Sequence, residues 1–203
     1  LGSLPMGYFI VKLLKKGDIT QVGSGRTGGT NAMRAGGVWA GLLTGVLDFG
    51  KGFAAVWLAR TLMRDQLLVQ AFAGAAAVLG HNWSLVLFLL TKRFSAGAGT
   101  GPNIGAATAF WPLAGVIAVP VILLFVFIVG YASLASIAAA LLVLISFTLL
   151  SVYASWPWQY VVFGFVTTSL VIVALLPNID RLIKGTERRV GLFAKKRGSS
   201  QNA

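Results

Sequence analysis

The sequence predicts an all-α, polytopic helical membrane protein with about seven transmembrane or re-entrant segments. Of its 203 residues, 57% are apolar and only 11% are charged, and the mean hydropathy is +0.82. Residues 94–179 contain no Asp, Glu, Lys, Arg or His, whereas one spanning helix needs only about 20 apolar residues. The Lys and Arg residues, which give a net charge of +12, lie in blocks between apolar runs. This pattern is typical of membrane loops and excludes a soluble nucleic-acid-binding domain.

The apolar runs define the expected helices. Residues 1–14 are apolar but too short to span a membrane, and Lys12 already interrupts them. We interpret them as the second half of a helix whose start is missing. The other expected helices are residues 38–62, 67–90, 104–129, 133–153 and 158–176.

The basic blocks predict the topology. They occupy residues 12–34, 92–93 and 181–197, and the positive-inside rule places all three on the cytoplasmic side. If each of the three apolar runs after residue 93 crossed the membrane once, the basic block at residues 181–197 would lie outside. The long run 104–129 contains Pro112 and Pro120, so we expect it to form two broken helices, or one re-entrant piece and one span. Residues 1–190 then form one membrane domain, and residues 191–203 form a basic, disordered cytoplasmic tail.

Composition restricts the possible chemistry. The chain has no Cys, one His and five acidic residues. Disulfides and thiolate catalysis are therefore excluded, and we expect neither a metal site nor a cofactor.

Residues 23–34 have the composition of a phosphate-binding loop. Glycines leave backbone N–H groups open to an anion, while hydroxyl, amide and guanidinium groups add donors. The Walker lysine is absent, which argues against a P-loop NTPase, and a flexible connector is the alternative. The expected phosphate ligands are Ser24, Gly25, Arg26, Thr30, Asn31 and Arg34.

Three ionisable residues lie within apolar runs. Asp48 and Lys51 are spaced i to i+3 and share a helical face, while His81 follows in the next run. Ionisable groups at membrane depth are candidates for function, and His81 is the one side chain suited to general base catalysis near neutral pH. The alternatives are a structural ion pair for Asp48 and Lys51 and a hydrogen-bonded structural role for His81.

Two further segments are candidates. The Gly-rich residues 95–103 either line a cavity, begin a re-entrant helix whose N-terminus faces an anion, or form a plain loop. Asn178 and Arg181 share a face at the end of the last run. They either reach a phosphate or form part of a juxtamembrane basic anchor.

Taken in order, these motifs resemble the PlsY family of bacterial integral-membrane acyl-phosphate:glycerol-3-phosphate acyltransferases, from residue 2 to about residue 188. Each motif is short, but six occur in the family's order. They are GSLPMG at 2–7, the loop 23–31 with Arg34, LDFGKG at 47–52, Gly80-His81, SLASI at 133–137, and NIDRL at 178–182 with Gly185 and Glu187.

The resemblance implies a seven-helix enzyme that moves a fatty acyl group from acyl phosphate to the 1-hydroxyl of glycerol 3-phosphate and yields lysophosphatidate. It implies a multi-pass protein of the bacterial plasma membrane that contacts lipids and no nucleic acid, with a cytoplasmic active face. Ser133, Asn178 and Arg181 join the phosphate ligands, and no covalent acyl-enzyme is implied. The residues assigned to catalysis are His81, Asp48, Lys51 and Ser136.

Departures from the family pattern leave an alternative open. Arg26 replaces the usual Asn, residues 94–99 lack two cations, residues 175–177 lack a histidine, and Gly130 stands in place of a basic residue. The alternative is a PlsY-like, non-catalytic membrane protein that binds lipid or phosphate, or a small-anion transporter.

Overall fold

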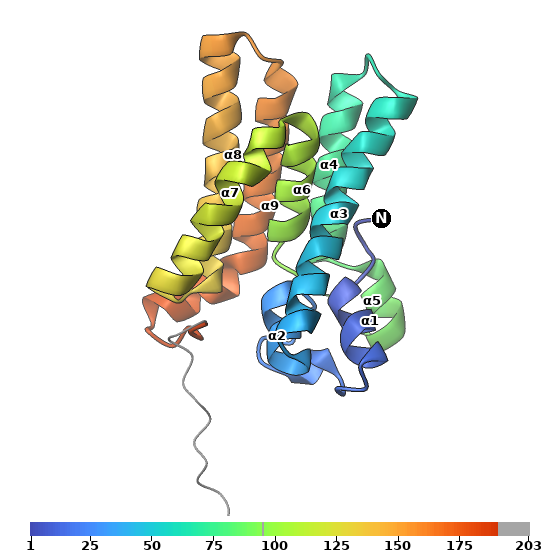
Figure 1. Ribbon diagram of the computed structural model, residues 1–203, viewed down its shortest axis with the longest axis vertical. Coiled ribbons are helices and arrows are strands. Elements are labelled where there is room, and N and C mark those ends of the chain that lie inside the picture. Colours follow the sequence, from blue (N-terminus) through green and yellow to red (C-terminus); the bar gives the residue numbers. More distant parts are fainter. Residues whose placement is uncertain (95, 191–203) are drawn as a thin grey trace, which may run out of the picture.

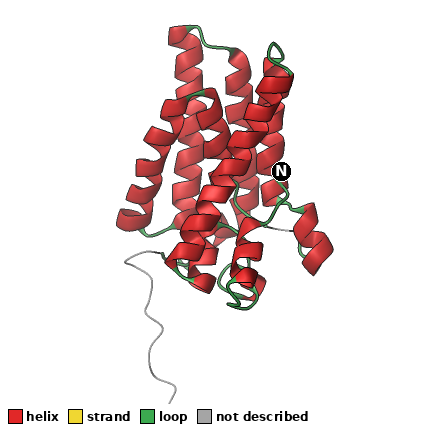
Figure 2. Cartoon of the chain, turned by 45° about the vertical axis from the view of Figure 1, so that its right-hand side comes forward, coloured by secondary structure: helices red, strands yellow, loops and turns green. Residues whose placement is uncertain are grey.

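The computed structural model is a helical bundle and describes residues 1–94 and 96–190. The long helices lie side by side, and three short helices, α1, α2 and α5, gather at one end (Figure 1). Regular structure in the described residues is entirely helical (Figure 2). The elements are α1 Met6–Leu13, η1 Ile19–Gln21, α2 Gly29–Gly36, α3 Val38–Leu62, α4 Leu67–Asn82, α5 Leu85–Thr91, α6 Thr100–Phe110, α7 Pro112–Leu124, η2 Phe125–Val129, α8 Ala132–Ala154 and α9 Trp158–Ile183.

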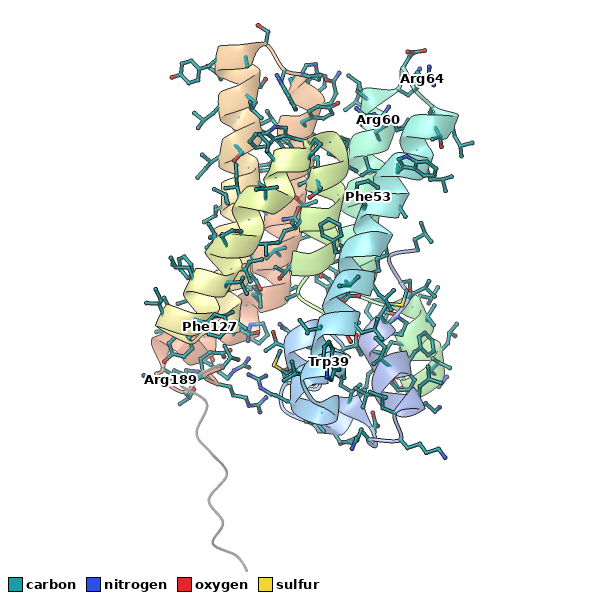
Figure 3. The ribbon with its side chains drawn as sticks, in the orientation of Figure 1. Trp39, Phe53, Arg60, Arg64, Phe127 and Arg189 are labelled. Carbon is teal, nitrogen blue, oxygen red and sulfur yellow. The ribbon has the colours of Figure 1, made fainter. Side chains whose placement is uncertain are left out.

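Four helical stretches in the described residues are long and apolar enough to cross a membrane: α3, Pro112–Val129, α8 and α9. Large apolar side chains point outward from them, and Trp39 and Trp57 are 82% and 56% exposed. Figure 3 shows Trp39, Phe53 and Phe127 on this outer surface. The class predicted from the sequence, a polytopic helical membrane protein, is therefore confirmed. The number of about seven segments stays a prediction, because it depends on how the short helices lie in the bilayer.

The predicted helix over residues 158–176 continues to Ile183 as α9, and two other predicted helices need larger corrections. The expected helix over residues 1–14 begins only at Met6, after Pro5, whose ring fixes φ and whose nitrogen has no hydrogen to donate. Before it, Ser3 bonds to the first turn of α5, where the Val86 N–H donates to the Ser3 Oγ at 3.1 Å. The run 67–90 is two helices, because Ser84 caps α5 by accepting the Leu87 N–H at 2.9 Å.

The run 104–129 is also divided, as predicted from its prolines. α6 ends at Phe110, the chain turns at Trp111, and Pro112 occupies the first turn of α7. Pro120, in contrast, lies inside α7 without ending it. α6 and α7 run in opposite directions, so the chain returns to the end at which α6 began (Figure 1). The basic segments of the first loop, the second loop and the residues after α9 accordingly meet at one end of the bundle, where Arg26, Arg93 and Arg188 line one cavity.

Glycine allows α3 and α6 to pack backbone to backbone. A side chain at Gly52 would overlap the Pro102 backbone, and one at Gly105 would overlap the carbonyl oxygen of Phe49. Such close contact is the usual way in which membrane helices gain packing energy without a hydrophobic driving force. It holds Asp48 of α3 directly beside Gly101 in the first turn of α6.

The opposite end of the bundle is an aromatic core. Phe110 of α6 contacts Phe147, Tyr160 and Phe163, with ring centroids 4.6 to 6.2 Å apart. Arg60 and Arg64 lie at this end, far from Arg189 (Figure 3). Packing is thus tight and apolar at one end, and the polar candidates collect at the other.

Candidate active site

A cavity of about 240 Å³ opens between the first loop, α2, the second loop and the ends of α8 and α9. Its lining combines polar and basic side chains with apolar ones, which include Ile122, Val126 and Leu175. Most of the residues predicted for the site line this cavity: Ser24, Arg26, Thr30, Asn31, Arg34, Asp48, His81, Ser133, Ser136, Asn178 and Arg181. Gly25 lines an adjoining cavity instead, and Lys51 lies behind Asp48 and His81.

Asn31 shapes the first loop. Its side-chain N–H groups donate to three backbone carbonyls, those of Ile19, Val22 and Arg26, at 3.2, 2.9 and 2.8 Å. Its Oδ1 accepts the Ser24 N–H at 3.2 Å. The side chain is 3% exposed. Asn31 therefore holds the loop in shape from inside, and its polar atoms already have partners.

The loop presents other groups to the cavity. Gly23 and Gly25 have φ values of +54° and +71°, which favour glycine. The N-terminus of α2 follows at Gly29, with Gly28 before it and Thr30 after it. The exposed hydroxyls of Ser24 and Thr30 and the first N–H groups of α2 thus form a site suited to an anion.

Arg26 bridges the cavity from the first loop to α9, because its Nη2 donates to the Ala174 carbonyl at 2.5 Å. Burial lowers the pKa of Arg26, and the neighbouring Arg181 lowers it further, whereas Glu187 raises it. Burial and Arg188 likewise lower the pKa of Arg34. The cations in this lining therefore repel one another, and an anion bound between them would relieve that repulsion.

Glu187 organises the end of α9. Its two carboxylate oxygens accept from Asn178 Nδ2 and Arg181 Nε, both at 2.7 Å. The Asn178 Oδ1 is buried and has no hydrogen-bond partner. Arg188, the next residue, donates to the Gly23 carbonyl and so ties this segment to the first loop. One carboxylate thus fixes two predicted phosphate ligands in place.

The three ionisable residues of the membrane interior form one contact group. Lys51 Nζ lies 3.0 Å from Asp48 Oδ1 and 2.7 Å from His81 Nδ1. It also donates to the Leu4 carbonyl at 3.0 Å. The three side chains are 3% to 4% exposed. The ion pair between Asp48 and Lys51 that was predicted from their i to i+3 spacing is therefore present. His81 contacts Lys51 and joins the pair to form a group of three.

The second loop closes the cavity over His81. The Thr27 N–H donates to the Ala96 carbonyl, which joins the two loops. A side chain at Gly97 would overlap the imidazole ring of His81, so only glycine fits there. α6 begins just beyond, at Thr100. Of the three interpretations of this segment, the cavity-lining one is confirmed, because Gly97, Ala98 and Thr100 line the site.

The two serines of α8 differ. Ser136 Oγ donates to the Ala132 carbonyl at 2.9 Å and accepts from Thr100 Oγ1 at 2.7 Å. Ser133 Oγ is buried and has no partner, although it borders the cavity. Ser133 is therefore the one of the two that is free to bond a ligand.

Sequence reasoning left several cavity residues out of the predicted site. Glu187 matched a family motif but was given no role, and Arg93 and Arg188 counted as loop charge. Arg93 lines an adjoining cavity of about 500 Å³ together with Ser24, Arg26, Arg181 and Arg188. An acid within a basic segment was a usable signal for Glu187, because acidic residues are scarce in this chain.

No metal site is visible among residues 1–94 and 96–190, where no three His, Asp or Glu side chains come together. The cavity joins an excess of guanidinium groups to apolar side chains within a membrane bundle. The fold and site therefore define a membrane-embedded protein that is suited to an amphipathic anion.

Comparison with known proteins identifies the family. The family model described as Glycerol-3-phosphate acyltransferase matches residues 1–185. Glycerol-3-phosphate acyltransferase 2 of Moorella thermoacetica is 38% identical over 191 residues, which cover 94% of this chain and 93% of that protein. Glycerol-3-phosphate acyltransferase 3 of Dehalococcoides mccartyi is 34% identical over 204 residues, covering 94% and 91%. The chain belongs to the glycerol-3-phosphate acyltransferase family.

Two solved structures have the same fold. The crystal structure of PlsY, an integral membrane glycerol 3-phosphate acyltransferase, in its glycerol 3-phosphate form has a TM-score of 0.81 and 35% identity. Its lysophosphatidic acid form has a TM-score of 0.78 and 34% identity. Both matches cover 94% of this chain and 90% of the other. The resemblance to PlsY inferred from the motifs is therefore confirmed.

Proposed function

We propose that this protein transfers a fatty acyl group from acyl phosphate to the 1-hydroxyl of glycerol 3-phosphate and releases lysophosphatidate and orthophosphate. The observation that carries the proposal is the combination of cationic and apolar side chains in the lining of one cavity. Arg26, Arg34 and Arg181 supply charge for phosphate groups. Ile122 and Val126 supply apolar surface for an acyl chain.

The proposed reaction needs no covalent enzyme intermediate. The 1-hydroxyl oxygen bonds to the acyl carbonyl carbon, and the bond from that carbon to the phosphate oxygen breaks. The hydroxyl proton leaves with the departing phosphate. Acceleration comes from holding the two substrates together and from hydrogen bonds to the developing oxyanion. Ser24, Thr30, Arg26, Arg34, Ser133, Asn178 and Arg181 hold phosphate in this proposal, with Gly25 and Asn31 shaping the loop.

In this proposal, cations from other segments take the place of those missing from the second loop. Arg26 reaches α9, and Arg188 is tied to the first loop. Both line the cavity with Arg34 and Arg181. Together with the family match, this favours the enzyme over a non-catalytic binding protein or a small-anion transporter.

The direct test is an assay of the purified full-length protein with acyl phosphate and glycerol 3-phosphate. Lysophosphatidate and orthophosphate are expected in equal amounts. Acyl carrier protein and coenzyme A thioesters, offered as alternative donors, identify the donor class. Folded protein that binds phosphate but forms no lysophosphatidate would establish the non-catalytic alternative.

We further propose that the cavity faces the cytoplasm of a bacterial cell and that the tail, residues 191–203, lies on the same side. That tail lies outside the described residues, so the support comes from the three basic segments that meet beside the cavity. The chain has no Cys, so single cysteines can report on sidedness. Cysteines introduced at Ser24 and Thr186 are expected to be protected from an impermeant reagent in intact cells, and one at Gln66 is expected to react. The reverse pattern would invert the topology.

A further inference from the structure

His81 is the sole histidine of the chain, and its two ring nitrogens have different surroundings. Nδ1 lies 2.7 Å from Lys51 Nζ in the buried interior. Nε2, on the other side of the ring, faces Gly97, whose missing side chain leaves room for the ring. Both His81 and Gly97 border the cavity. One nitrogen is therefore occupied by the protein, and the other faces the space where a substrate would lie.

Lys51 determines whether His81 Nδ1 can carry a hydrogen. An ammonium group has three hydrogens to donate and cannot accept. Lys51 Nζ has three acceptors within reach: the Leu4 carbonyl at 3.0 Å, Asp48 Oδ1 at 3.0 Å and His81 Nδ1 at 2.7 Å. The contacts to Leu4 and His81 are hydrogen bonds, whereas the contact to Asp48 is an ion pair, because Asp48 Oδ1 has no hydrogen-bond partner. For this arrangement Nδ1 must carry a lone pair, and a neutral imidazole then carries its hydrogen on Nε2.

The competing arrangement is an Asp–His pair. In it the Nδ1–H would donate to Asp48 Oδ1, leaving Nε2 bare as a general base. The distance between Nδ1 and Asp48 Oδ1 is 3.5 Å, longer than the 2.7 Å to Lys51 Nζ. A hydrogen on Nδ1 would also point toward the Lys51 ammonium. The geometry around Nδ1 therefore opposes the general base role expected from the sequence alone.

We propose that His81 is a neutral hydrogen-bond donor through Nε2 and that Lys51, held by Asp48 and the Leu4 carbonyl, is the positioning residue that sets this tautomer. The identity of the hydrogen-bond acceptor rests on the proposed function: it is the carbonyl oxygen of acyl phosphate, on which negative charge develops as the hydroxyl attacks. His81 neither gains nor loses a proton in this step. The hydroxyl proton leaves with orthophosphate.

The tautomer can be measured directly. Protein labelled with 15N-histidine and purified without a polyhistidine tag contains a single imidazole. Long-range 1H–15N correlation spectra are expected to show a protonated Nε2 and an unprotonated Nδ1. In Lys51→Met, the proton is expected to move to Nδ1, which then donates to Asp48. Lys16→Met, at an exposed lysine, serves as the matched control and is expected to leave both resonances unchanged. A wild-type Nδ1 that carries a proton would overturn the proposal.

Enzyme activity tests whether His81 acts as a hydrogen-bond donor. The amide N–H of glutamine can replace the Nε2–H as a donor but cannot act as a base. His81→Gln is therefore expected to retain kcat at least about 10-fold above that of His81→Ala, the value of roughly one hydrogen bond to developing charge. Equal loss in two variants that elute and melt as folded protein would overturn the donor role. Wild-type protein that makes no lysophosphatidate would instead overturn the proposed function, while the tautomer measurement still stands.

Discussion

Two charged clusters face the same cavity and are built in opposite ways. The lysine cluster, Asp48, Lys51 and His81, pairs one cation with one carboxylate, and Lys51 also donates hydrogen bonds to the Leu4 carbonyl and His81 Nδ1. The arginine cluster, Arg26, Arg34, Arg181 and Arg188, has four cations around one acid, Glu187. The first cluster is balanced before any substrate arrives, and the second is not.

This difference separates two tasks. A buried group whose charges are paired keeps one geometry, because any other arrangement strands a charge in a medium of low dielectric constant. Repelling cations gain free energy when a phosphate enters. The lysine cluster therefore positions atoms, and the arginine cluster binds substrate. Substitutions in the first should reduce stability, whereas substitutions in the second should reduce affinity.

The largest expected effect is in the lysine cluster. Asp48→Asn leaves the buried Lys51 without its counterion, and breaking a buried pair in this way costs about 3 to 5 kcal/mol. Asp180→Asn is the matched control, because Asp180 and Lys184 form a pair at 2.9 Å whose side chains are 59% and 65% exposed. Exposed pairs contribute about 0 to 1 kcal/mol. The measurement is the unfolding free energy in detergent, and similar losses in the two variants would contradict the distinction.

The arginine cluster should respond through affinity. Arg26→Asn removes a cation that crosses the cavity, so we expect phosphate binding to weaken by about 100-fold with little loss of stability, since two charge-assisted hydrogen bonds are lost. A lysine at Ala98, which lines the same cavity, should restore part of the affinity in a double-mutant cycle. Isothermal titration with phosphate measures the affinity of both variants. An inert Arg26→Asn would mean that this residue does not compensate for the missing cations.

Within the first loop, substitutions at Ser24 and Asn31 should again separate an effect on substrate affinity from an effect on stability. Ser24→Ala removes one exposed hydroxyl at the cavity, and we expect the KM for glycerol 3-phosphate to rise about 10-fold at unchanged stability. Asn31→Ala removes an amide that bonds three carbonyls and one N–H of the loop. It should lower both affinity and melting temperature. Equal melting temperatures for the two variants would show that the loop does not depend on Asn31.

The fold was predictable for α3, where charged residues lie beyond both helix ends, but not at the end of α9, which continues through Asp180 and Arg181. The expected helix over residues 38–62 matches α3 residue for residue, because Arg26 and Arg34 precede it and Arg64 and Asp65 follow. The division of residues 67–90 at Trp83 was missed because both halves are apolar, although the polar residues Asn82 and Ser84 flank the break. Its signal was Ser84, a good N-cap. Hydropathy measures how much a segment prefers lipid and carries no information on where its backbone turns.

The candidate site could likewise be predicted only in part from the sequence. The motifs identified which segments meet, but they did not identify the atoms that bond. That Lys51 contacts His81 and Leu4, or that Glu187 joins Asn178 to Arg181, depends on tertiary packing between segments far apart in sequence. The i to i+3 spacing of Asp48 and Lys51 was readable because it is local to one helix.

The smallest expected effect separates the serines of α8. Ser133→Ala removes a buried hydroxyl that has no protein partner, so the folded state loses little while a contact to substrate disappears. A neutral hydrogen bond contributes about 0.5 to 1.5 kcal/mol, which corresponds to a fall in kcat/KM of about 2- to 10-fold. Ser136→Ala is the matched control at the next turn, where the hydroxyl is bonded to Ala132 and Thr100. It should reduce the melting temperature and change kcat/KM less than Ser133→Ala does. Ser136 carried the catalytic assignment in the sequence analysis, so a larger kinetic loss in Ser136→Ala would restore that assignment and place the reacting atoms closer to Thr100.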